Sequence, residues 1–142
     1  KIIDVIPTSQ LNLEEKYSQK IPYEYPKSSI DNLKEDYFGK IFGTRSGDKG
    51  GCANLGVWAK SQEAYSFLFD FLTVKKLKEL LPDLEKFEID RFELPNIYSL
   101  NFYVHGILQD GVSSSTRMDG QAKSLGEYLR AKKINFPEQL LK

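Results

Sequence analysis

The chain of 142 residues contains very few of the side chains that build metal centres and covalent cross-links. Cys52 is its one cysteine and His105 its one histidine, so an internal disulfide is excluded and no familiar zinc or iron–sulfur spacing exists. A single cysteine is also typical of a reducing compartment. We therefore expect no metal ion, no cofactor and an intracellular, cytoplasmic protein, with an organellar location left open.

Net charge and long apolar segments are also absent. The 20 basic and 20 acidic residues cancel, which removes the attraction that phosphate backbones and anionic membranes exploit. No segment approaches the roughly 20 apolar residues of a membrane helix. These absences predict a soluble protein that binds neither nucleic acid nor membrane. Because the sequence starts at Lys1, we expect a fragment or a processed chain.

Glycine is missing from the first 37 residues, which hold three of the six prolines. Proline favours extended backbone and resists helix, yet the segment is too apolar for a freely solvated linker. We therefore expect residues 1–37 to form a partly extended arm that lies on the domain or on a partner. Residues 38–142 are expected to form one domain.

Periodicity predicts the first elements of that domain. Apolar residues alternate along residues 38–45 and 53–60, which indicates two strands of a hairpin around a glycine-rich turn. Helical spacing follows over residues 61–72, with Ser61 as N-cap, and Thr73 can cap a second short helix that ends at Pro82. Along residues 87–94 the apolar positions change parity, which predicts a β-bulge near Asp90 and Arg91.

The second half completes the pattern. Apolar residues alternate over 98–108, Asp119 can cap a helix that contains Leu125 and Leu129, and residues 134–136 indicate a last short strand. The order predicts an α+β fold, a ferredoxin-like two-layer sandwich (β-α-β-β-α-β) with an extra N-terminal hairpin strand. Both helices then cover one sheet face. The opposite face is expected to carry Asn54, Trp58, Ser99, Asn101, Tyr103 and His105.

Six of the ten glycines lie between Gly39 and Gly56, in a turn that also carries charged residues. A phosphate-binding loop is disfavoured, because the spacing is not that of a Walker motif and a strand follows instead of a helix. Two interpretations remain: a tight hairpin in which Asp48 accepts backbone N–H groups and Arg45 pairs with a carboxylate, or one part of a polar site. Cys52 is interpreted as filling a small pocket, with a nucleophilic couple to His105 as the alternative.

A polar site would need three distant segments to converge at one end of the sheet. Its cations could hold an anion, and Asp48 or Asp119 could transfer a proton, although no catalytic residue is assigned. The local alternatives are that Asp119 caps its helix and Asn96 forms a turn. The candidate residues are Arg45, Asp48, Lys49, Asn54, Asn96, Asn101, Arg117, Asp119, Gln121 and Lys123.

The same three segments resemble the AtuA-like ferredoxin-fold domain of acyclic terpene utilisation proteins. The resemblance covers about residues 38–136. Its motifs are Arg45-x-Gly47-Asp48-Lys49-Gly50, Glu93-Leu94-Pro95-Asn96 and Arg117-x-Asp119-x-Gln121. The chain departs at Phe92, where tyrosine is common, and at Ala122, where glycine usually follows the glutamine. The resemblance implies an accessory, assembly or ligand-binding domain linked to acyclic terpenoid or branched acyl-CoA catabolism.

Two hypotheses for the function follow. In the first, the domain assembles through the open sheet face around Trp58, Tyr103 and His105, with a second copy or a larger AtuA-type or acyl-CoA enzyme as partner. In the second, the domain is a small enzyme or binding site for an acidic small molecule, built from the glycine-rich turn and residues 117–123.

Overall fold

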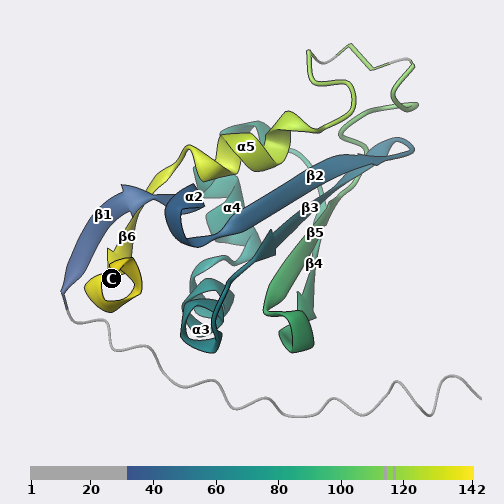
Figure 1. Ribbon diagram of the computed structural model, residues 1–142. Coiled ribbons are helices and arrows are strands. Elements are labelled where there is room, and N and C mark those ends of the chain that lie inside the picture. Colours follow the sequence, from purple (N-terminus) through teal and green to yellow (C-terminus); the bar gives the residue numbers. More distant parts are fainter. Residues whose placement is uncertain (1–31, 114, 117) are drawn as a thin grey trace, which may run out of the picture.

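The computed structural model describes residues 32–113, 115–116 and 118–142, so most of the predicted arm lies outside the described residues. Four strands form the central antiparallel sheet: β2 (Gly43–Lys49), β3 (Cys52–Trp58), β4 (Ile89–Leu94) and β5 (Ser99–Val104). Their order across the sheet is β2-β3-β5-β4 (Figure 1). The predicted hairpin of β2 and β3 is therefore confirmed.

Helices cover one face of this sheet, as Figure 1 shows. They are α3 (Gln62–Phe71), α4 (Val74–Leu80) and α5 (Ser124–Arg130). The Ser61 hydroxyl accepts a hydrogen bond from the Ala64 amide, and the Thr73 hydroxyl accepts one from the Lys76 amide. These bonds satisfy N–H groups that a helix start leaves without partners, so both predicted caps are confirmed.

The core lies between the helices and the inner sheet face. The inward residues of β3 and β5 are fully buried: Ala53, Leu55, Val57, Leu100, Phe102 and Val104. Their neighbours in sequence point to the other face, because side chains alternate along a strand. The alternation predicted for residues 98–108 is thus confirmed as far as Val104, where β5 ends.

The first predicted strand begins later than the sequence indicates. Residues Phe38–Ile41 form a helical turn, α2, and β2 starts only at Gly43. Phe38 and Phe42 are both buried, with ring centroids 4.9 Å apart, and the Phe42 amide donates to the Phe38 carbonyl. Two aromatic residues four positions apart reach the same core from one helical turn, and this packing overrides their alternation with Gly39 and Ile41.

A second, two-stranded sheet joins the two ends of the described chain. It pairs β1 (Leu33–Tyr37), whose residues the sequence assigns to the arm, with β6 (Lys133–Pro137). The predicted last strand therefore exists, but it lies outside the main sheet, where β2 already occupies the edge beside β3. From β3 onward the elements follow the predicted order, and the α+β, ferredoxin-like class is confirmed.

The predicted β-bulge is wrong. β4 pairs with β5 without interruption, from Ile89 opposite Val104 to Leu94 opposite Ser99. The continuous register turns a charged residue, Arg91, toward the helices. Its guanidinium lies 4.7 Å from the centre of the Phe69 ring. Its Nη2 donates to the Phe69 carbonyl at 2.7 Å. The strand therefore keeps its register, because the guanidinium is held at the rim of the core by Phe69 and by an ion pair with Glu93 at 2.7 Å.

Candidate functional site

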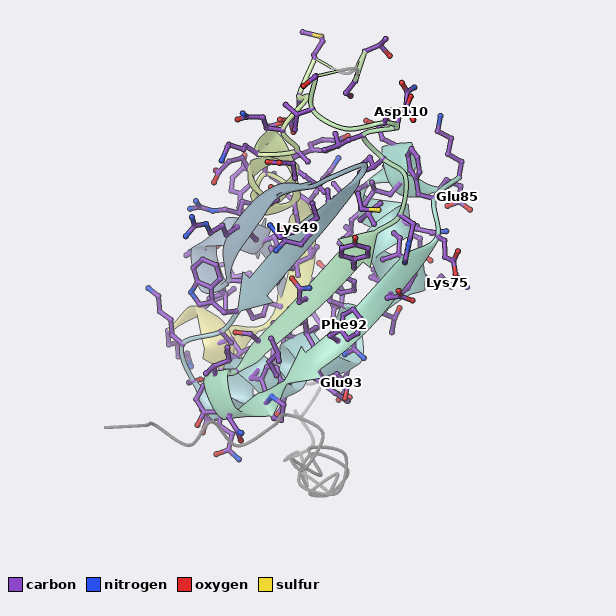
Figure 2. The ribbon with its side chains drawn as sticks, turned by 90° about the vertical axis from the view of Figure 1, so that its right-hand side faces the viewer. Lys49, Lys75, Glu85, Phe92, Glu93 and Asp110 are labelled. Carbon is purple, nitrogen blue, oxygen red and sulfur yellow. The ribbon has the colours of Figure 1, made fainter. Side chains whose placement is uncertain are left out.

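The face of the sheet opposite the helices is open within the described part of the chain (Figures 1 and 2). Paired strands set its composition, because directly opposed residues share a face. The rows across the face run from β2 through β3 and β5 to β4. They are Gly43-Trp58-Ser99-Leu94, then Arg45-Gly56-Asn101-Phe92, then Gly47-Asn54-Tyr103-Asp90.

One end of this face is apolar. Exposed fractions are 39% for Trp58, 50% for Phe92, 43% for Leu94 and 65% for Ile97, which lies in the 3₁₀ turn Pro95–Ile97 between β4 and β5. The Trp58 ring lies against Gly43, where any Cβ would collide with it. Large apolar groups gathered on one uncovered surface are characteristic of a protein interface.

The other end is polar and contains the single histidine and the single cysteine of the sequence. His105 Nε2 lies 2.8 Å from Asp90 Oδ2, and the Tyr103 ring meets the His105 ring edge-on at 5.0 Å. A hydrogen bond with Cys52, together with partial burial, raises the pKa of the Tyr103 hydroxyl above its ordinary value. No hydrogen bond among the described residues joins Cys52 to His105, so the geometry does not form the nucleophilic couple.

Charge is distributed unevenly across the open face. The β2 edge is basic, with exposed Arg45 and Lys49, whereas Asp90 makes the β4 edge acidic. Glu88 extends this acidic edge, because its carbonyl accepts a hydrogen bond from the His105 amide and so continues the register. Figure 2 shows Lys49 and Phe92 toward opposite edges of the sheet.

Asn54 and Asn101 occupy the middle of the open face. The Asn54 amide donates to the Asn101 side-chain oxygen at 3.4 Å across β3 and β5. Both residues are partly buried and lie on the predicted face. Their hydrogen bond links the two central strands. The middle of the open face is therefore polar and lies between the apolar region and the charged region.

The glycine-rich turn is explained by close packing. Gly50 has φ +62°, a conformation that side chains disfavour, and a Cβ at Gly51 would collide with the Gln109 carbonyl oxygen. The Leu108 amide donates to the Gly51 carbonyl at 2.9 Å. The turn is thus docked on the segment after β5. No ion pair or hydrogen bond among the described residues uses the side chains of Arg45 or Asp48, so the predicted contacts within the hairpin are not seen.

The segment before α5 meets the inner side of β2. The Ser46 hydroxyl donates to the Lys123 carbonyl at 3.0 Å and accepts from the Gly126 amide at 2.9 Å. The Asp119 carboxylate accepts from the amides of Lys123 and Ser124, at 2.9 and 3.0 Å. Asp119 therefore supports the segment that leads into the helix, but it is not the N-cap that the sequence predicts, because α5 begins only at Ser124 and Lys123 is its N-cap.

The expected convergence of three segments at one end of the sheet is wrong. The glycine-rich turn joins β2 to β3 at one end, whereas Asn96 lies in the turn between β4 and β5 at the opposite end. Six residue steps of strand separate these ends by about 20 Å. The crossover through α3 and α4 causes this, because it returns the chain so that β4 runs parallel to β3. The turn after β4 therefore lies where β3 ends, whereas the glycine-rich turn lies where β3 begins.

The proposed anion-binding residues are also divided between two sides. Arg45 and Lys49 belong to the open face, whereas Asp48 shares the inner side with Ala53. Lys123 and Asp119 lie in the segment that contacts this inner side, and Gln121 is exposed there. Arg117 lies outside the described residues. One small ligand therefore could not contact the described residues on both sides of β2 at once.

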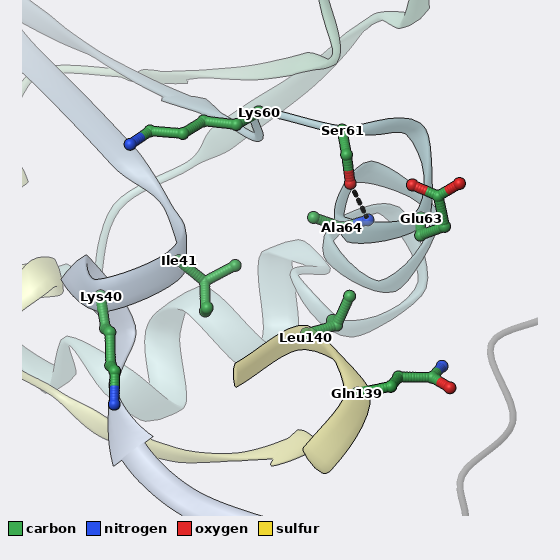
Figure 3. Close-up of a pocket in the computed structure, with 8 residues that line it drawn as sticks. All are labelled: Lys40, Ile41, Lys60, Ser61, Glu63, Ala64, Gln139 and Leu140. Carbon is green, nitrogen blue, oxygen red and sulfur yellow. Dashed lines mark hydrogen bonds between the residues drawn. The ribbon is translucent and has the colours of Figure 1, made fainter. Parts of the chain in front are cut away.

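A groove of about 550 Å³ lies elsewhere, between α2, the start of α3 and the C-terminal segment (Figure 3). Lys40 lines it, but its Nζ already lies 2.6 Å from the Asp36 carboxylate. Ser61 also lines it and is occupied as the cap of α3. Two polar groups of the groove, Lys40 and Ser61, therefore have structural roles, and the open sheet face is the stronger candidate.

Phe92, Leu94 and Ile97 are the candidate interface residues that sequence reasoning missed. Their signal was present in the parity change along residues 87–94. We interpreted that change as a bulge that returns apolar residues to the core. The uninterrupted register instead places Phe92 and Leu94 on the open face, beside the predicted Trp58.

Comparison with known proteins completes the description. Among the described residues, no helix has the length and apolar character to cross a membrane, and no group of three or more His, Cys, Asp or Glu side chains could hold a metal ion. Searches of curated proteins and of solved structures found no match. Residues 38–135, more than half of the chain, match the AtuA ferredoxin-like domain. The chain therefore belongs to the AtuA ferredoxin-like domain family.

Proposed function

We propose that this protein is an accessory domain of an enzyme system that works by burying its open sheet face against a protein partner, which is either a second copy of the chain or the enzyme itself. The observation that carries the proposal is the group of Trp58, Phe92 and Leu94 on a face that no described helix covers (Figure 1), with Ile97 exposed in the adjoining turn. Each ring or branched side chain is roughly half exposed. Burying the rest of one such side chain contributes about 1 kcal/mol to the free energy of binding. Aromatic anchors of this kind dominate many interfaces.

The enzyme served belongs, in this proposal, to acyclic terpenoid or branched acyl-CoA catabolism, and the larger AtuA-type protein is the first partner to test. The support is membership of the AtuA-related family together with the exposed face. An accessory role fits a surface whose centre is an amide pair instead of a deep cavity. The domain then contributes a docking surface and no chemistry.

The test is a binding titration of the full chain with purified larger AtuA-type protein and acyl-CoA enzymes of the source organism. Phe92→Ser combined with Leu94→Ser is expected to weaken binding at least about tenfold, because both anchors are lost. Tyr128→Ser is the matched control, since Tyr128 is an equally exposed ring on α5. Binding that survives the double change, or that the control abolishes, would contradict the proposal.

A further inference from the structure

We propose that the occupant of the open face is a second copy of this chain. The inference rests on the proposed function and names its partner. The two copies pack face to face about a two-fold axis that runs parallel to the strands, between β3 and β5. This operation exchanges β2 with β4 and β3 with β5 within each row of the sheet. Residue partners across the interface can therefore be read from the strand register.

Size is complementary in this arrangement. In the first row, Trp58 of one copy lies over Ser99 of the other copy. Leu94 of one copy lies over Gly43 of the other copy and meets the Trp58 ring that covers this glycine. In the second row, Phe92 lies over Arg45, as in a cation–π contact. Small residues thus face large ones, as the packing of two sheets about 10 Å apart requires.

The charges of the two copies are complementary as well, and by the two-fold symmetry each charged contact occurs twice. The acidic edge of β4 in one copy lies over the basic edge of β2 in the other. Lys49 faces Glu88, and Asp90 faces Gly47, which Arg45 and Lys49 flank. Opposite potentials that meet across an interface favour association and fix its register.

The other two-fold axis in the plane of the face runs across the strands, and the same charges exclude it. That axis places β2 over β2 and β4 over β4, so that the basic edges face each other and the acidic edges face each other. It also places the apolar end at Trp58 over the polar end at His105. Only the axis along the strands matches both size and charge.

The face measures about 19 Å across its four strands and about 23 Å along them. This area is at the low end of the surface that specific complexes bury. We therefore expect a dimer that forms in the micromolar range. Residues 1–31 and an unlike protein are the competing occupants, and the experiment separates them.

The test is sedimentation equilibrium of the full chain from about 1 to about 200 μM, with charge reversals. Lys49→Glu and Glu88→Lys each place two like-charged pairs in the interface, so each is expected to weaken dimerisation about tenfold. Combined in one chain, they restore the opposite charges and the wild-type constant. Lys75→Glu and Glu85→Lys are matched controls, since both side chains are exposed and neither residue belongs to the rows of the open face (Figure 2).

A monomer at all concentrations overturns the inference, and so does a dimer that the reversals leave unchanged or that the double reversal does not restore. A monomer whose Trp58 is shielded at every concentration indicates residues 1–31 as the occupant. Failure of the proposed function has a different result. If the proposed function is wrong, Phe92→Ser combined with Leu94→Ser leaves the association with every protein unchanged. If only the second copy is wrong, the chain binds a different protein, and the same two substitutions weaken that binding.

Discussion

Replacing Ser46 with alanine removes the two hydrogen bonds that join β2 to the start of α5. The hydroxyl donates to the Lys123 carbonyl and accepts from the Gly126 amide. That amide belongs to the first turn of α5, where N–H groups have no partner within the helix, and Gly126 is buried. Ser46 thus caps a helix from a neighbouring strand.

The expected loss follows from what remains after the change. The Lys123 carbonyl is at an exposed residue, and water can replace its lost partner. The Gly126 amide loses its acceptor at a buried position, where Thr44 packs closely against the glycine. An unsatisfied buried N–H costs about 1–3 kcal/mol. The midpoint of thermal unfolding falls by about 4 °C per kcal/mol for a chain of this size.

The assay is urea unfolding followed by circular dichroism, with Ser99→Ala as the matched control. Ser99 also lies on a strand, but its hydroxyl donates only to the Ile97 carbonyl two residues away. Its removal is expected to change the free energy of unfolding by less than about 0.5 kcal/mol. Equal stability of the two variants would refute the role assigned to Ser46.

Three further predictions test the packing and the charges. Gly51→Ala is expected to cost about 1–3 kcal/mol by chemical denaturation, because the methyl group meets the Gln109 carbonyl. Arg91→Ala is expected to lower the free energy of unfolding by about 2 kcal/mol, since a stacked and hydrogen-bonded guanidinium is lost; no change would contradict the explanation of the unbulged strand. A hydrogen bond from Lys40 lowers the pKa of Asp36, so its stabilisation is complete above the ordinary carboxyl pKa and is lost as the pH falls through the lowered value. Thermal unfolding of wild type and Asp36→Asn should therefore differ at pH ~6 and converge near pH ~2, and a gap that widens in acid would refute this sign.

Local features of the sequence predicted much of the fold. The helices after Ser61 and Thr73 appear where hydroxyl caps precede helical spacing, and β3 and β5 follow strict alternation. These signals are local, because a cap and a face depend on neighbours within one or two turns. The placement of β6 beside β1 is a contact between distant segments, and no local pattern specifies which sheet a short strand joins.

The site shows the same limit. Trp58 and Tyr103 were predicted on the open face, because alternation fixes the face of a strand. The parity change along residues 87–94 predicts a bulge near Asp90 and Arg91, because a continuous strand there turns a charged residue toward the core at a cost in free energy. The contact of Arg91 with Phe69 removes that cost, and only the tertiary structure reveals it. The supposed convergence failed for a topological reason, since Asn96 and the glycine-rich turn lie at opposite ends of the sheet.

The most direct test of the open face uses Trp58, which is the one tryptophan in the chain and is 39% exposed on that face. Its emission and its quenching by acrylamide can be followed as the protein assembles, either with itself or with a purified partner. If the open face is the interface, assembly shifts the emission to the blue and reduces quenching. Assembly that leaves both the emission and the quenching of Trp58 unchanged would contradict the account.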